Sequence, residues 1–160
     1  LSHLRIAFKS PHTIKEAAER GYYFLNDILK RPDEAKQWWQ EALAVQRAYD
    51  LANDERQSAS PDDEYIKPEI DEATLNEIKR TFSEHKNVGK VWLAQKVTHH
   101  EGDPVYIVAF RPKGIYLSFE RVQSAVASSV SVSVNLFSVS LWGDASKLGK
   151  KVKKNGIELF

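Results

Sequence analysis

The densest group of side chains with chemical potential is the segment His99-His100-Glu101-Gly102-Asp103. Imidazole and carboxylate groups bind metal ions and transfer protons, so their convergence would suit a small-molecule enzyme or a metal-dependent hydrolase. Adjacent histidines on an extended turn point apart, however, and the spacings H-x-H, H-x-x-x-H and H-E-x-x-H do not occur. His99, His100, Glu101 and Asp103 are therefore catalytic candidates only. We favour a solvated turn between two strands, and we expect neither a metal nor a cofactor.

Motifs for other kinds of catalysis are absent from the sequence. Serine is abundant, but there is no G-x-S-x-G nucleophile elbow. Neither G-x-G-x-x-G nor G-x-x-x-x-G-K-[ST] provides a phosphate-binding loop. The chain also contains no cysteine, which excludes disulfides, thiolate zinc sites and cysteine nucleophiles. These observations favour a non-enzymatic protein and leave the question of an enzyme open.

A run of lysines near the C-terminus is a candidate anion-binding surface. Its partner would be a phosphate backbone, an anionic lipid or an acidic protein face, bound by Lys147, Lys150, Lys151 and Lys154. The solvated face of an amphipathic helix explains the same lysines, and we favour that interpretation. No aromatic residue is interleaved with them, so stacking of bases is not expected. With 23 Lys+Arg against 22 Asp+Glu, the chain has no strongly basic field, and nucleic acid is not an expected partner.

Two pairs of adjacent aromatic residues, Tyr22-Tyr23 and Trp38-Trp39, provide the main interaction hypothesis. Neighbouring residues on a helix point about 100° apart, so at least one member of each pair is expected near the rim of a two-helix unit. Exposed Trp and Tyr are frequent anchors of protein interfaces. In the alternative, the helices pack on the rest of the chain and bury all four side chains. The sequence leaves both possibilities open.

The aromatic pairs lie in segments with helical periodicity. Thr13 and Glu16 have the T-x-x-E spacing of a capping box, and apolar residues then recur at helical spacing as far as Leu29. Arg31-Pro32 ends this helix, because the residue before a proline avoids the α region, and Pro32 suits the first position of the next helix. The sequence therefore predicts an αα-hairpin.

The second half of the chain has the pattern of a small α+β domain. Its expected elements are a helix from Asp71 or Thr74, a strand over 88–97, a strand over 105–110, a helix over 117–128, a strand over 131–141, a helix capped by Asp144 and a short strand or tail over 157–160. Apolar residues on both faces make the strand over 105–110 an interior strand. The Ser/Val alternation over 131–141 is typical of a half-exposed strand, which could accept another strand if it lies at a sheet edge.

Two groups of residues carry a family resemblance. One is Leu75…Phe82-x5-Val88-x2-Val91-Trp92-Leu93, and the other is Asp103-Pro104-Val105-Tyr106-Ile107-Val108. Together with the alternating strand and the short Lys-rich helix, they make roughly residues 71–160 resemble the C-terminal domain of the SseB family, the enhanced serine sensitivity proteins. The resemblance implies a small cytoplasmic bacterial domain with a regulatory or protein-interaction role. It implies no catalytic motif and no ligand, and the predicted hairpin lies outside it.

The favoured interpretation is a cytoplasmic α+β protein with a helical hairpin over 1–52, a polar linker over 53–70 and a mixed or antiparallel sheet domain over 71–160, in the order α-β-β-α-β-α-β. We expect a non-enzymatic interaction or regulatory module that contacts a protein partner or a second copy.

No run approaches the roughly 20 apolar residues of a membrane span. Because the sequence begins with Leu1 rather than Met, we expect a longer protein, in which an upstream anchor would place this chain at the cytoplasmic face.

Overall fold

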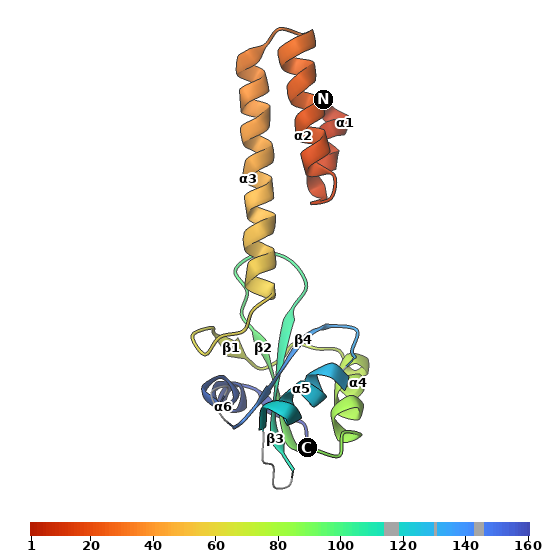
Figure 1. Ribbon diagram of the computed structural model, residues 1–160, viewed down its shortest axis with the longest axis vertical. Coiled ribbons are helices and arrows are strands. Elements are labelled where there is room, and N and C mark those ends of the chain that lie inside the picture. Colours follow the sequence, from red (N-terminus) through yellow and green to blue (C-terminus); the bar gives the residue numbers. More distant parts are fainter. Residues whose placement is uncertain (114–118, 130, 143–145) are drawn as a thin grey trace. The chain divides into compact units, whose positions relative to one another are not determined.

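The computed structural model describes residues 1–113, 119–129, 131–142 and 146–160. The chain divides into two compact units, Leu1–Glu55 and Arg56–Phe160. The first unit is helical, and the second contains the described β-sheet with helices around it (Figure 1). The α+β class expected from the sequence is confirmed.

The first unit is a helical hairpin with a short helical segment packed beside it (Figure 1). Helix α2 (Ile14–Tyr23) continues into the π-helical segment η2 (Phe24–Ile28), and both run antiparallel to the long helix α3 (Pro32–Arg56). Helix α1 (Ser2–Ile6) and the 3₁₀ turn η1 (Ala7–Lys9) precede them. The hairpin follows the sequence prediction, whereas α1 and η1 were not expected.

The connection between the two arms of the hairpin depends on the backbone at two residues. Lys30 has a φ of 54°, in the left-handed region that reverses the chain direction sharply. Pro32 begins α3, as predicted, because an N–H group at the first helical position would have no acceptor within the helix. Acidic residues occupy the first turn of α3, where the helix dipole favours negative charge.

The predicted capping box at the start of α2 is wrong. The Thr13 side chain does not cap the helix; its hydroxyl donates instead to the carbonyl oxygen of Ala7 at 2.7 Å. Glu16 forms an ion pair with Arg20 one turn along the helix. The cause is the unexpected 3₁₀ turn before the helix, which presents carbonyl groups to the threonine.

The predicted apolar stripe of the first arm is also wrong at its C-terminal end. The amide of Leu29 donates to the carbonyl of Phe24 at 3.0 Å, the i→i+5 bond of a π-helix. Leu25 stays buried, but Phe24, Ile28 and Leu29 are exposed. A wider turn changes the angle between successive side chains, so a stripe that assumes 3.6 residues per turn no longer faces the partner helix.

The second unit is built around a mixed sheet of five strands: β1 (Tyr65–Ile66), β2 (Val88–Lys96), β3 (Val105–Pro112), β4 (Asn135–Ser140) and β5 (Ile157–Glu158). The order is β1-β2-β3-β4, and β5 also pairs with β2. All pairs are antiparallel except β3 with β4, which run parallel. The interior position predicted for β3 is confirmed.

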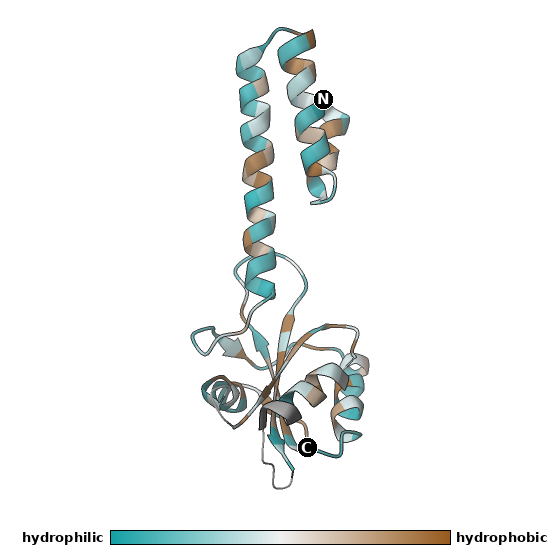
Figure 2. Cartoon of the chain, in the orientation of Figure 1, coloured by the Kyte–Doolittle hydropathy of each residue, from teal (hydrophilic) through white to brown (hydrophobic). Residues whose placement is uncertain are grey.

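Helices cover both faces of this sheet (Figure 1). Helix α4 (Glu72–Ser83) and α5 (Phe119–Ser129) contribute to one core, and α6 (Ser146–Asn155) contributes to the other. Alternate residues of β3 divide between the two: Tyr106, Val108 and Phe110 enter the first core, and Val105, Ile107 and Ala109 the second. Figure 2 shows the apolar residues gathered on the strands at the centre of this unit.

The predicted element order of the second half is present, with one difference in the length of a strand. From α4 onward the order is α-β-β-α-β-α-β, and Asp71 caps α4 by accepting from the Thr74 amide at 2.9 Å. Strand β4 begins at Asn135 and is shorter than expected, because Val132 and Val134 pack on the α4–α5 core instead of pairing. The helix cap predicted at Asp144 lies outside the described residues.

The segment 53–70 is not the solvated linker that the sequence suggested. Its first residues complete α3, and Tyr65 pairs with Lys96 as part of the sheet. The Lys96 side chain is 4% exposed, and its ammonium group lies 3.0 Å from the Asp63 carboxylate. The Tyr65 hydroxyl donates to the Ser60 carbonyl at 2.7 Å, and burial raises the pKa of this phenol well above its ordinary value. A polar segment can therefore be ordered when its own tyrosine is buried and one of its carboxylates pairs with a buried lysine.

Candidate functional site

Arg56 holds the turn that carries His99, His100, Glu101 and Asp103 through two backbone carbonyl groups. The Arg56 guanidinium donates to the carbonyl oxygen of Asp103 at 3.1 Å and to that of His100. Within the turn, Gly102 has a φ of 146°, and a Cβ there would lie 2.7 Å from the same guanidinium. The turn thus wraps around an arginine, and this arrangement explains its backbone conformation.

The described residues do not bring these side chains together as a metal site. In those parts of the chain, no group of three or more His, Cys, Asp or Glu residues is placed to hold an ion. His99, Glu101 and Asp103 are exposed, and His100 is partly buried. The geometry of the turn gives no reason to assign it a reaction.

The two adjacent tryptophans of α3 lie on opposite sides of the hairpin seam. Trp38 is 3% exposed, and its indole N–H donates to the carbonyl of Ala18 on α2 at 3.2 Å. The Phe8 ring of η1 lies 4.7 Å from the Trp38 ring, and the Arg5 guanidinium of α1 lies 5.7 Å from it. The segment that the sequence analysis missed therefore covers Trp38, which removes this residue from the predicted interaction set.

Trp39 faces the side that no other element of the first unit covers. It is 37% exposed and packs edge-to-face on Tyr22, with ring centroids 6.0 Å apart. Tyr22 and Tyr23 are 40% and 59% exposed, and Leu43, one turn after Trp39, is 41% exposed. The prediction that one tryptophan would lie near the rim agrees with this geometry, and both tyrosines are accessible as well.

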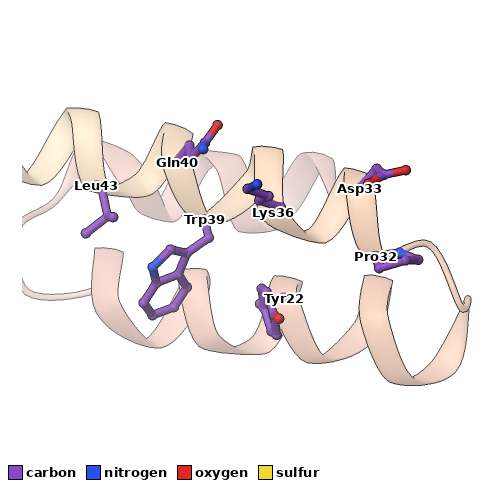
Figure 3. Close-up of a pocket in the computed structure, with 7 residues that line it drawn as sticks. All are labelled: Tyr22, Pro32, Asp33, Lys36, Trp39, Gln40 and Leu43. Carbon is purple, nitrogen blue, oxygen red and sulfur yellow. The ribbon is translucent and has the colours of Figure 1, made fainter.

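Two adjoining hollows lie between α2 and α3 on this side, and Trp39 and Leu43 line both of them. The larger has a volume of about 760 Å³ and extends past Tyr22 to Pro32. The smaller, of about 250 Å³, extends in the other direction to Ile14. Figure 3 shows Trp39 reaching from α3 towards the helix that carries Tyr22. We call Tyr22, Trp39 and Leu43 the open face; it is the candidate functional site.

The alternating strand is a poorer candidate for binding a partner. Strand β4 lies at the end of the strand order, as strand addition requires. Both of its ends have other contacts: the Asn135 side-chain amide donates to the Arg56 carbonyl at 3.2 Å, and the Gln123 side chain accepts from the Ser140 backbone amide at 3.4 Å. The backbone N–H at the Ser140 end is therefore already paired with a side chain.

The four lysines predicted to bind an anion do not form one surface. The Lys151 ammonium donates to the Pro61 carbonyl at 2.8 Å and lies above the Tyr65 ring. Lys147 and Lys154 are exposed elsewhere on α6. Lys150 instead lines a hollow whose other described lining residues are Arg111, Leu141, Trp142 and Lys153. The sequence analysis did not connect Arg111 or Trp142 with the lysines, because they lie about 40 and 10 positions earlier and only the fold joins them.

None of the helices in the described ranges is both long and apolar enough to cross a bilayer. The assignment to the SseB family stays a prediction. Comparisons of the chain with protein-family models, with curated proteins and with solved structures found no match.

Proposed function

We propose that the protein is a non-enzymatic interaction module whose hairpin binds the hairpin of a second copy through the open face. The supporting observation is the exposed open face of Tyr22, Trp39 and Leu43, next to a buried Trp38. A two-helix unit has too little interior to cover both sides of its own seam. A second hairpin supplies the missing layer and completes a four-helix bundle.

The charges along α3 favour a second copy as the occupant. Lys36 lies seven residues before Leu43 and Asp50 seven residues after it, so all three share one face of the helix. When two α3 helices align antiparallel about Leu43, Lys36 lies opposite the partner's Asp50. The two-fold symmetry of such a contact repeats the pair at the other end.

The same alignment places two further pairs of side chains opposite each other. Arg47 lies opposite the partner's Trp39, where a guanidinium can stack on the indole face. Gln40 lies opposite the partner's Gln46, which permits a hydrogen bond between amides. Each side chain of the open face still exposes about two fifths of its surface, so its burial contributes only about 1 kcal/mol. The dimer is therefore expected to dissociate on dilution.

The test is sedimentation of the full chain over a concentration series. The wild type is expected to shift from monomer to dimer, and Leu43→Glu to remain monomeric because the substitution places two carboxylates at the two-fold axis. Ile6→Glu is the matched control: Ile6 is an aliphatic residue on α1 that is 62% exposed and lies outside the open face. A wild-type chain that is monomeric throughout, or an Ile6→Glu chain that loses the dimer equally, contradicts the proposal.

A charge reversal tests the alignment itself. Lys36→Glu creates two like-charge pairs with the partner's Asp50 and is expected to weaken the dimer. Adding Asp50→Lys to the same chain restores both pairs with the signs exchanged, and the dimer is expected to return. If the double variant dimerises no better than Lys36→Glu alone, the antiparallel alignment about Leu43 is wrong. Binding of the open face to a helix of another protein would then be the remaining form of the proposal.

A further inference from the structure

A hollow of about 340 Å³ lies in the second unit at the ends of two neighbouring strands. Strands β3 and β4 run parallel, with Phe110 opposite Ser140 as their last pair, so their carboxyl ends reach the same edge of the sheet. Arg111 extends from one strand, and Leu141 and Trp142 directly follow the other. Ligands of open α/β sheets bind at this type of edge, beyond the carboxyl ends of the strands.

Hydrogen bonds fix the strand ends that form the hollow. The Leu141 amide donates to the Phe110 carbonyl at 3.0 Å and extends the ladder by one step. The Trp142 amide donates to the Ser140 hydroxyl at 3.2 Å. These contacts hold the backbone that carries the Trp142 indole next to the strand that carries Arg111. The sheet therefore fixes the backbone positions from which the indole and the guanidinium extend.

The described lining of the hollow is cationic. It contains Arg111, Lys150 and Lys153 and no carboxylate. Lys153 lies 4.7 Å above the Trp92 ring and close to Glu158, which partly offsets its charge. Within the described residues, the side chains of Arg111 and Lys150 make no hydrogen bond or ion pair, and both residues are exposed. An arginine and a lysine that face the same space are suited to bind phosphate, the guanidinium through paired N–H donors.

The remaining lining is apolar and aromatic. Leu141 continues into the core beneath α6, and Trp142 is 50% exposed. An exposed indole beside cations can stack on a planar ring whose phosphate binds those cations. The volume lies near the lower end of the range for small-molecule sites, about 300–1,000 Å³. That size suits a single nucleotide, whereas a nucleic-acid strand would need a groove that continues.

We propose that this hollow binds a mononucleotide, with the base stacked on Trp142 and the phosphate bound by Arg111 and Lys150. The proposal does not depend on the interaction proposed for the hairpin. The sequence analysis found no aromatic residue among the lysines; the fold supplies one from the end of β4. A phosphate loop is not required, because side chains rather than backbone amides provide the cations.

The test is calorimetric titration of the full chain with adenosine 5′-monophosphate, adenosine, inorganic phosphate and a single-stranded oligonucleotide. Adenosine 5′-monophosphate is expected to bind more tightly than phosphate or adenosine alone. Trp142→Ala should weaken the nucleotide by about 5- to 150-fold, the range that corresponds to loss of one stacked base, and leave phosphate unaffected. Lys150→Gln and Arg111→Gln should weaken both. Lys147→Gln, an exposed lysine of the same helix outside the hollow, should change neither.

Three results would overturn the proposal. The first is no heat of binding with adenosine 5′-monophosphate at millimolar concentration. The second is equal affinity for nucleotide and phosphate together with indifference to Trp142→Ala, which would mean an adventitious ion only. The third is oligonucleotide binding far tighter than nucleotide binding, which would assign the surface to nucleic acid. Far-ultraviolet circular dichroism of each variant establishes that the fold is retained, and the exposure of the substituted side chains makes this the expected result.

Discussion

Trp38 and Trp39 are neighbours in the chain, yet they lie in opposite kinds of environment. The side of the hairpin with Trp38 is closed by α1 and η1, which place Phe8 and Arg5 against its ring. On the other side, the Trp39 ring packs edge-to-face on Tyr22 and remains partly open to solvent. The difference is not one of residue type, since both are indoles on one helix. It arises because a short extra segment can cover only one of the two sides.

The second unit also contains one buried and one exposed tryptophan, but for a different structural reason. Trp92 is 3% exposed and Trp142 is 50% exposed. Here helices cover both faces of the sheet, so no face is left open, and the exposed tryptophan follows the end of a strand instead. An uncovered layer produces an extended apolar face, which suits a protein partner. A strand end produces a small hollow with mixed chemistry, which suits a small ligand.

The largest expected effect is on the closed side of the hairpin. Trp38→Ala removes a buried indole together with its hydrogen bond, and the free energy of unfolding is expected to fall by about 3–5 kcal/mol. Trp39→Ala removes a half-exposed ring and one edge-to-face contact, and a loss of about 1 kcal/mol is expected. The measurement is urea unfolding of the full chain followed by helical circular dichroism. The protein concentration must be low enough that the midpoint no longer depends on it.

Equal losses for these two substitutions would remove the contrast between the two sides. Trp38→Phe is a useful intermediate, because it keeps an aromatic ring beside Phe8 but lacks the N–H that donates to Ala18. Its loss is expected to lie between those of the two alanine variants. A Trp38→Phe chain as stable as the wild type would show that ring packing alone fixes the residue.

Much of the second unit was predictable because its signals are local and consistent. The alternation in β2 and β3, the cap at Asp71 and the apolar positions of α4 each follow from residues close together in sequence. The linker assignment to 53–70 was wrong for the opposite reason. Composition shows that Asp63 and Lys96 are charged, but only the fold shows that they pair with the lysine buried.

The hairpin was predictable in outline and not in its details. Periodicity and the Arg31-Pro32 boundary located both arms, and the angle between adjacent residues predicted that one tryptophan would lie near the rim. Which tryptophan is covered depends on α1 and η1, whose five and three residues are too few for a clear periodic signal. The hollow in the second unit could not be predicted at all, since Arg111 lies in β3, Trp142 follows β4 and Lys150 lies in α6.

The next largest effect is expected at Gly21, which packs directly against the Trp38 ring of the other arm. A Cβ at this position would lie 2.3 Å from the Trp38 indole, so Gly21→Ala must push the ring away. Overpacking of this kind costs about 1–3 kcal/mol, against about 1 kcal/mol gained in helix propensity. We therefore expect a net loss of stability in the wild-type chain.

The sign of this effect should reverse when the indole is absent. In a Trp38→Leu chain the colliding ring atoms are gone, so Gly21→Ala should add about 1 kcal/mol through helix propensity alone. The double-mutant cycle, measured by the same urea unfolding, isolates the contact between the two helices. A stabilising Gly21→Ala in the wild-type chain would mean that the arms are not packed this closely, and the closed side would lose its main support.

The smallest effect concerns the two buried tryptophans, which differ in what accepts their N–H. Trp38 donates to a backbone carbonyl, whereas Trp92 donates to the Glu158 carboxylate at 3.2 Å. The hydrogen bond from Lys90, at 2.6 Å, holds the pKa of Glu158 below its ordinary value. A lowered carboxyl pKa in the folded state contributes stability that is present at neutral pH and is lost as the pH falls through that pKa.

The indole N–H resonance of Trp92 is therefore expected to move in acid, with a midpoint below the value of about 4.3 for an exposed glutamate. The resonance of Trp38 should stay in place over the same range, because its acceptor does not titrate. Glu158→Gln keeps an acceptor oxygen but cannot ionise, so it should abolish the movement of the Trp92 resonance while the sheet stays folded. A Trp92 midpoint above the ordinary glutamate value would contradict the lowered pKa of Glu158. A Trp38 resonance that moves in parallel would show that acid loosens both units together. In that case the two buried tryptophans would report a common unfolding rather than two separate environments.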